Sequence, residues 1–319
     1  MKLSLVLRIV ITLFFMGGLY FIVRGELPQV WGALLKVNPR FLTLALLLNL
    51  LTIGIISVRL RLFLDAYGLH FSLLEATSLS FIGLFFNNFL PTSMGGDLAK
   101  AYFVHKKARR KLVSFASVLA DRLIGLFSMV CMALLGLFSL WRNEAVSLKL
   151  AVGTLFLLAC LCLSVLFNRK VAKGIRLLTY PLERFGLGER MKGVYDVLNT
   201  LQRKQPLLWK ALTLSLIAHT LAIFSVFTLV KGLSLEVPIF HLFLVFPLIT
   251  TASMLPSLGG LGVREGAFVY FLGETLGKGN AAALSILWFG VLIFLSAIGG
   301  FFYLTYGSVP LKEIEEVRS

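Results

Sequence analysis

The chain has 319 residues, of which 58% are hydrophobic and only 14% are charged, and its mean hydropathy is +0.90. Soluble domains carry about 25% charged residues, so this composition excludes an ordinary water-soluble domain and predicts an all-α polytopic membrane protein. The net charge of +16 would suit nucleic acid on a soluble protein. Here Lys and Arg gather in short stretches between apolar runs, which is typical of cytoplasmic loops beside anionic lipid headgroups. We therefore expect membrane lipids, and not nucleic acid, as partners.

Six segments are long and apolar enough to cross a bilayer. Each has about 18 or more residues with few charges, which is enough for a helix to cross a hydrocarbon core of about 30 Å. They are 5–23, 41–58, 113–140, 150–167, 208–230 and 281–306. We interpret the first as a span and not as a cleaved signal sequence. Residues 1–319 then form a single transmembrane domain.

Two further apolar segments contain helix-breaking residues. Segment 72–103 is interrupted by Pro and paired Gly within 90–96, and segment 238–276 within 255–262. The basic stretches 104–112 and 168–207 should both be cytoplasmic loops. A re-entrant hairpin in each broken segment satisfies these charges, one entering from the cytoplasm and one from the outer face. Both termini then lie inside the cell.

The order span, hairpin, span occurs twice, over 41–140 and over 208–306, with opposite orientation. The two breaks also share a sequence pattern. Matching positions are Leu90 and Leu255, Pro91 and Pro256, Gly95-Gly96 and Gly259-Gly260, and Lys100 and Arg264. This pattern predicts an inverted-topology repeat, a design in which broken helices place a substrate site near the middle of the membrane.

The two breaks are the candidate substrate site. A helix that restarts after a break directs free N–H groups and partial positive charge toward the midplane, which favours an anion. Lys100 and Arg264 would add full charge. The alternative is that the breaks are packing kinks and that both cations reach an interface. The candidate residues are Asn87, Asn88, Pro91, Gly95, Gly96, Asp97, Lys100, Asp121, Arg122, Pro256, Gly259, Gly260, Gly262, Arg264 and Glu265.

Several of these residues have two interpretations. Asn87 and Asn88 could bond either the freed backbone or a ligand, and Asp97 could be either an N-cap or a ligand contact. Arg264 and Glu265 are adjacent, and a deep charge is costly, so we expect a paired or functional role. Asp121 and Arg122 lie at the interface if their span starts at residue 123, and near the midplane if it starts at 113.

Three polar residues outside the candidate set also have expected places. Arg59 and Arg61 should anchor a helix end at the headgroups. For His219, a packed, hydrogen-bonded side chain is favoured over a proton relay. The chain contains no H-E-x-x-H, G-x-S-x-G or phosphate-loop pattern. We expect no metal, no cofactor and no catalytic site, and therefore a transporter in place of an enzyme.

Three stretches carry a resemblance to a known family. They are FFNNFLPTSMGGDLAKAYFV (85–104), ASVLADRLIGL (116–126) and LPSLGGLGVREGAF (255–268). They resemble a flippase-like integral membrane family that includes the membrane region of lysylphosphatidylglycerol synthase. The resemblance runs from about Phe41 to Tyr306. Asp121-Arg122 is similar to an acidic–Arg pair common in that family, and Arg59 and Arg61 are similar to its basic residues after the second span.

The resemblance implies a lipid flippase or scramblase-like transporter. Its substrate would be an anionic or modified phospholipid, or an isoprenoid-linked lipid, moved between leaflets of a bacterial or archaeal cytoplasmic (inner) membrane. No segment resembles the soluble aminoacyltransferase domain of the full synthase, so lipid aminoacylation is not expected. The alternatives are a transporter of a small soluble anion and an accessory subunit of a lipid-modifying or glycolipid pathway. A lipid-modifying enzyme and a second copy of this chain are further candidate partners.

Overall fold

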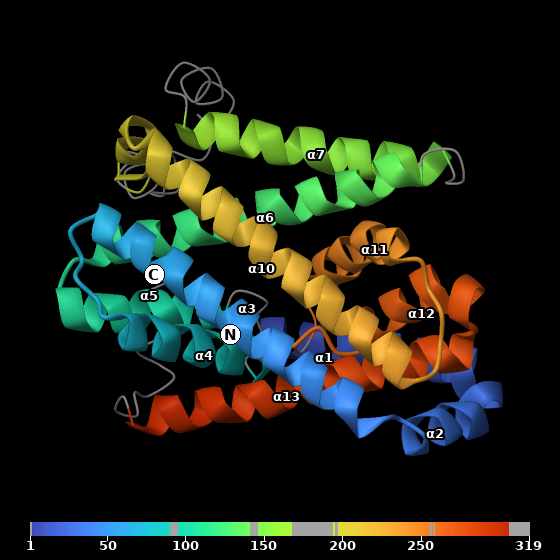
Figure 1. Cartoon of the computed structure of the whole chain (residues 1–319). Helices are drawn as coiled ribbons and strands as arrows, with labels where there is room; N and C mark the ends of the chain where they lie inside the picture. Colours follow the sequence, from blue (N-terminus) through green and yellow to red (C-terminus); the bar gives the residue numbers. More distant parts are fainter. Residues whose placement is uncertain are drawn as a thin grey trace.

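The structure, a computed structural model, describes residues 2–89, 95–140, 146–167, 194, 197–255, 257 and 259–305. Every regular element in these ranges is helical (Figure 1). The helices are α1 (Lys2–Val23), α2 (Leu27–Leu35), α3 (Pro39–Ala66), α4 (Leu73–Phe89), α5 (Gly95–Ala108), α6 (Lys111–Ser139), α7 (Val146–Phe167), α10 (Gln205–Gly232), α11 (Ile239–Ala252), α12 (Val263–Leu276) and α13 (Lys278–Thr305). Two short 3-10 turns are η1 (Arg24–Glu26) and η2 (Thr200–Arg203).

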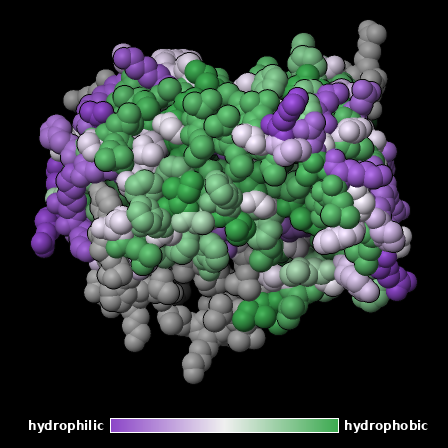
Figure 2. All heavy atoms as spheres, turned by 60° about the horizontal axis from the view of Figure 1, so that its bottom comes forward, coloured by the Kyte–Doolittle hydropathy of each residue, from purple (hydrophilic) through white to green (hydrophobic). Residues whose placement is uncertain are grey.

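The predicted all-α polytopic membrane architecture is confirmed. The six predicted spans coincide with α1, α3, α6, α7, α10 and α13. Five helical stretches are long and apolar enough to cross a membrane: Ile9–Leu35, Pro39–Ala66, Lys111–Ser139, Gln205–Gly232 and Lys278–Thr305. On the face shown in Figure 2, hydrophobic residues cover the middle, and hydrophilic residues gather at two opposite ends. Large apolar side chains such as Phe14, Phe138 and Leu304 are exposed on the surface of the molecule, as expected of a surface that faces lipid.

Local sequence signals explain where two helices begin. The Asn38 side chain accepts a hydrogen bond from the Arg40 N–H (3.0 Å), and Pro39 occupies the first turn of α3. Before α4, the Ser72 hydroxyl accepts from the Glu75 N–H (3.2 Å), and the Glu75 carboxylate accepts from the Ser72 N–H (2.8 Å). This reciprocal pair is a capping box.

Each broken segment forms two short helices, α4 with α5 and α11 with α12. The two hairpins enter the bundle from opposite ends, at the left and at the right of Figure 1. The expected basic loop 104–112 is wrong in its extent, because α5 continues to Ala108 and α6 starts at Lys111. Only Arg109 and Arg110 connect them, and Arg109 has a positive φ of 56°. Most of the predicted loop 168–207 lies outside the described residues.

Helices from the two halves of the chain pack on one another. α3 packs along α10, α4 packs on α13, and α11 packs on α6. A Cβ at Gly299 of α13 would lie 2.1 Å from the Phe81 carbonyl oxygen of α4, and one at Gly136 of α6 would lie 2.3 Å from the Leu244 nitrogen of α11. Each hairpin thus meets a buried glycine on the last long helix of the other half. The inverted repeat stays a prediction, and this reciprocal packing agrees with it.

Candidate functional site

The two predicted breaks meet inside the bundle. Gly259 has a φ of +57°, and a Cβ there would lie 2.4 Å from the Asn88 carbonyl oxygen at the end of α4. The Asn88 side-chain amide donates to the Ser296 hydroxyl of α13 (2.6 Å). The end of the first hairpin helix therefore touches both the second break and the last long helix. Pro91 and Pro256 lie outside the described residues.

Asn87 closes the first hairpin on itself. Its side-chain oxygen accepts from the Gly96 N–H in the first turn of α5 (2.9 Å), so of the two interpretations of this amide the structure shows the bond to the freed backbone. A Cβ at Gly96 would lie 2.0 Å from the Gly83 carbonyl oxygen. Gly96 is thus needed for close packing of α4 on α5, and Gly95 precedes it in the same first turn.

The second hairpin carries a local charge pair. The Glu265 carboxylate accepts from the Gly262 N–H (2.7 Å) and from the Arg264 Nε and Nη2 atoms (3.0 and 2.8 Å). Arg264 and Glu265 are both buried, and the Arg264 guanidinium lies 4.7 Å from the centre of the Phe289 ring. The predicted mutual pairing is confirmed. The Glu265 carboxylate occupies the Gly262 N–H at the start of α12, so this N–H is not available to a ligand.

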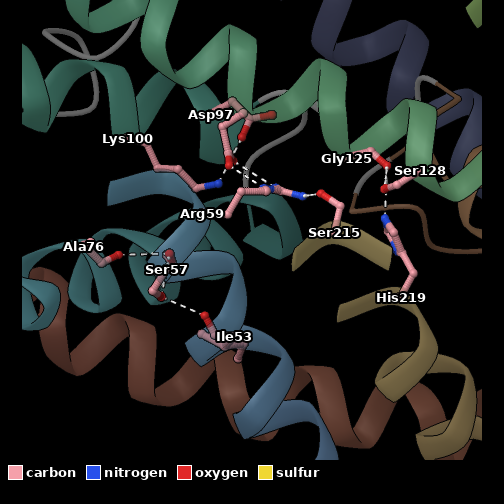
Figure 3. Close-up of polar contacts among 12 residues, drawn as sticks. Ile53, Ser57, Arg59, Ala76, Asp97, Lys100, Gly125, Ser128, Ser215 and His219 are labelled. Carbon is pink, nitrogen blue, oxygen red and sulfur yellow. Dashed lines mark hydrogen bonds and ion pairs between the residues drawn. The ribbon is translucent and has the colours of Figure 1, made fainter. Parts of the chain in front are cut away.

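The first half contains a second buried ion pair, which joins three helices. The Arg59 Nε and Nη2 atoms donate to the two oxygens of Asp121 (2.6 and 3.0 Å), and Nη1 donates to the Ser215 hydroxyl of α10. Figure 3 shows the Arg59 guanidinium reaching from α3 toward Ser215. The side chains of Arg59 and Asp121 are only 7% and 4% exposed. The expected headgroup anchor is therefore wrong for Arg59, because this guanidinium has a buried carboxylate within reach.

Asp97 lies within the first turn of α5 and not at its N-cap. One of its carboxylate oxygens accepts from the Lys100 Nζ (3.1 Å), and the other lies 3.6 Å from the Arg122 Nε. Asp121 and Arg122, although adjacent, therefore have different partners. Because α6 starts at Lys111, the pair lies about 15 Å along the helix at 1.5 Å per residue, which supports the deep alternative.

Lys100 is also buried. A Cβ at Gly83 would lie 2.2 Å from the Lys100 Cε, so the lysine side chain passes over this glycine of α4. In Figure 3, Lys100 points toward the Arg59 guanidinium and the carboxylate groups beside it. Neither Lys100 nor Arg264 reaches an interface in the way that the packing-kink alternative requires, since both are less than 10% exposed.

Two cavities lie between these charges. One, of about 280 Å³, is lined by Asn87, Asn88, Arg122, Gly259, Gly260 and Arg264 together with apolar residues such as Phe246 and Trp288. The other, of about 220 Å³, is lined by Arg59, Asp97, Lys100, Asp121 and Arg122. Of the candidate residues that the structure describes, Gly95, Gly96, Gly262 and Glu265 are absent from both linings. The sequence predicts that Lys100 and Arg264 belong to one site, whereas in the structure Arg264 lines the first cavity and Lys100 lines the second.

Arg122 lines both cavities and differs from the other cavity cations. Its side chain is 26% exposed, and its Nε atom is buried without a hydrogen-bond partner in the described structure. Arg59, Lys100 and Arg264 each donate at least one hydrogen bond to a carboxylate. Among the described cavity cations, Arg122 is therefore the one with a buried nitrogen that has no hydrogen-bond partner, and this nitrogen can donate to a ligand.

His219 lines both cavities as well. Its Nε2 atom lies 3.0 Å from the Gly125 carbonyl oxygen, and Figure 3 shows the ring pointing from α10 to α6. The predicted packed, hydrogen-bonded histidine is confirmed. This contact and the Arg59–Ser215 bond together connect α10 to the first half.

Sequence reasoning missed Arg59 as a cavity residue. The spacing of the polar residues in segment 41–58 and at the position that follows it could have indicated this role. Asn49, Thr52 and Arg59 lie three and seven positions apart, on one face of a helix, and all three are buried and line the cavities. A polar stripe on an apolar helix indicates a face turned away from lipid.

Comparison with known proteins agrees with this architecture. Residues 5–300 match the family described as the lysylphosphatidylglycerol synthase TM region. The chain belongs to this family. A UPF0104 membrane protein of Methanothermobacter thermautotrophicus is 23% identical over 263 residues, which cover 76% of this chain and 78% of the relative. The relatives and the membrane-length helices support a prokaryotic membrane protein.

Two further relatives match over shorter regions. UPF0104 membrane protein PH1989 of Pyrococcus horikoshii is 28% identical over 152 residues, 46% of this chain and 45% of the relative. UPF0104 membrane protein MJ1595 of Methanocaldococcus jannaschii is 28% identical over 123 residues, 38% of this chain and 36% of the relative. The match thus spans less than half the length of these two relatives.

Proposed function

We propose that this protein is a flippase or scramblase-like transporter that moves a lipid between leaflets by passing its phosphate-bearing headgroup through the central cavities. The observation that carries the proposal is the position of Arg122, which lines both cavities and keeps a buried Nε without a hydrogen-bond partner among the described residues. Charged side chains deep in a membrane protein are costly, and they generally mark a substrate pathway.

The chemistry of the cavities supports a phosphate group. A guanidinium presents a planar set of donors that matches phosphate oxygens, and such charge-assisted bonds are strong at low dielectric. Small-molecule sites have volumes of about 300–1,000 Å³, and these cavities, of about 280 and 220 Å³, suit a headgroup better than a whole lipid. The acyl chains would stay in the bilayer during transport.

The family supports a lipid-related role, because its description names the membrane region of a lipid synthase. The substrate class in this proposal is a phosphate-bearing lipid, either an anionic phospholipid or an isoprenoid-linked lipid. We infer that the halves 41–140 and 208–306 rock against each other along the α3–α10 contact. Such motion around a site at the meeting point of two repeats is the usual form of alternating access.

Lipid movement in proteoliposomes tests the proposal. Purified protein would be reconstituted with fluorescent phosphatidylglycerol, and transfer between leaflets would be followed by chemical quenching of the outer leaflet. We expect transfer by the unchanged protein, and a loss of about tenfold or more in Arg122→Gln, since a bond between charged groups contributes about 1.5–3 kcal/mol. Arg61→Gln is the matched control, because Arg61 is an exposed arginine on α3 and should transport normally.

Two results would contradict the proposal. One is transfer no faster than in empty vesicles, and the other is normal transfer by both Arg122→Gln and a Lys100→Ala, Arg264→Ala double variant. Uptake of inorganic phosphate into the same vesicles, with no lipid movement, would instead support the transporter of a small soluble anion.

A further inference from the structure

The five charged residues that line the 220 Å³ cavity are three cations and two carboxylates, on α3, α5 and α6. Arg59 binds both oxygens of Asp121, and Lys100 binds Asp97. Arg122 is left with one contact of 3.6 Å to a carboxylate oxygen that has no hydrogen-bond partner among the described residues. These five side chains therefore sum to one formal positive charge, and Arg122 is the cation whose contact with a carboxylate is the longest of the three.

Arg59 cannot supply this charge to a ligand directly. Its Nε, Nη1 and Nη2 atoms all donate to protein groups, and its side chain is 7% exposed against 26% for Arg122. Its guanidinium also lies against Gly125, where a Cβ would come within 3.1 Å of Nη1. Arg59 is therefore held in place on several sides and is occupied by Asp121.

We propose that Arg59 is a positioning residue that sets the net charge of the cavity: by neutralising Asp121, it leaves Arg122 with only its longer contact to Asp97, so that Arg122 binds the phosphate of the substrate. Without Arg59, Asp121 would lose both of its hydrogen bonds to the guanidinium, and the cavity would hold two cations and two carboxylates. Arg122 and Lys100 would then be the cations available to both carboxylates. An anionic headgroup would meet a neutral site whose cations were already paired.

This inference rests on the proposed function, and its test uses binding, which does not depend on transport. Detergent-solubilised protein would be titrated with short-chain phosphatidylglycerol, with short-chain phosphatidylcholine as the probe of no net charge. The variants are Arg59→Gln, Asp121→Asn, the double variant with both changes, and Arg59→Lys. Circular dichroism and gel filtration would show which variants remain folded.

The charge assignment predicts a specific order of affinity for phosphatidylglycerol. Arg59→Gln should bind phosphatidylglycerol roughly tenfold more weakly than the unchanged protein, as expected when a bond between charged groups is lost. The double variant restores the net charge without restoring the ion pair, and it should bind about as tightly as the unchanged protein. Asp121→Asn should bind at least as tightly as the unchanged protein. Arg59→Lys should have an affinity close to that of the unchanged protein, because it keeps the positive charge.

Each contrary result has a distinct meaning. If the double variant binds no better than Arg59→Gln, the ion pair itself or a direct contact by Arg59 is what matters, and the inference is overturned. If Arg59→Gln binds normally, the neutralisation of Asp121 is irrelevant and the inference is again overturned. If the unchanged protein shows no preference for phosphatidylglycerol over phosphatidylcholine, the cavity does not select a net negative charge and the inference is overturned, whereas the proposed function fails only if the unchanged protein moves no lipid in proteoliposomes.

Discussion

The two broken-helix hairpins hold their charges in different ways. In the first half, the buried pair Arg59–Asp121 joins α3 to α6 across 62 positions of sequence, and Arg122 on α6 contacts Asp97 of α5, which also binds Lys100. In the second half, the buried pair is made by two neighbours, Arg264 and Glu265, on one helix. The second pair can form as soon as α12 forms. The first pair requires α3 and α6 to be packed together, and the bond from Arg59 to Ser215 requires α10 as well.

Because of this difference, the charged groups of the two halves would respond differently to movement of the helices. A local pair that also caps its own helix moves with that helix as one body, so Arg264 keeps its carboxylate through any rocking of the halves. The dispersed cluster changes whenever α3, α5 or α6 moves, because its bonds cross between helices. In the proposed transport cycle, movement of the first half would therefore alter the charge that a ligand meets, whereas Arg264 in the second half would stay paired with Glu265.

The largest expected effect is on stability, and it compares the two buried arginines. Arg59→Met should lower the free energy of unfolding by about 3–5 kcal/mol, because it strands a buried carboxylate. Arg264→Met should cost less, about 1.5–3 kcal/mol, because Glu265 still accepts the Gly262 N–H at the start of α12. Unfolding in mixed micelles with increasing denaturing detergent measures both. An equal loss of stability in the two variants, or a larger loss in Arg264→Met, would show that the bond to the Gly262 N–H does not stabilise the buried Glu265 carboxylate.

A smaller effect is expected where the two hairpins touch. Gly259→Ala places a Cβ 2.4 Å from the Asn88 carbonyl oxygen, on backbone with a positive φ, and should destabilise the protein by about 1–3 kcal/mol. Gly266→Ala is the matched control, since a Cβ at this α12 position meets nothing within 4 Å and alanine favours helix. If Gly259→Ala is as stable as Gly266→Ala, the contact between the breaks is looser than the structure indicates.

The same contrast explains what could be predicted from the sequence. Helix spans follow from long apolar runs, and the breaks follow from Pro and paired Gly, because both depend on neighbouring residues. The Arg264–Glu265 pair was predictable for the same reason. The Arg59–Asp121 pair was not, because nothing in the local sequence indicates which of several carboxylates a given arginine will meet once the helices pack.

Adjacent residues also misled the sequence interpretation in the first half. Asp121 and Arg122 were treated as one unit, but successive residues on a helix point about 100° apart. Asp121 therefore faces α3 and Arg59, and Arg122 faces α5 and Asp97. At the start of α12, Glu265 is three positions after Gly262 and accepts its N–H. Spacing within a helix could have indicated this capping.

The smallest expected effect comes from comparing two arginines on the same helix, Arg61 and Arg59 of α3. Arg61 is two residues after Arg59 on α3, yet its side chain is 45% exposed, and it lies 3.5 Å from Asp65, itself 41% exposed. An exposed i,i+4 pair contributes about 0.3–0.5 kcal/mol, so Arg61→Ala should change stability by no more than this and should leave lipid transfer unchanged. The detergent-unfolding and proteoliposome assays described above measure both quantities. A loss at Arg61 comparable to that at Arg59 would mean that total positive charge on α3, and not the buried pairing with Asp121, determines how the first half works.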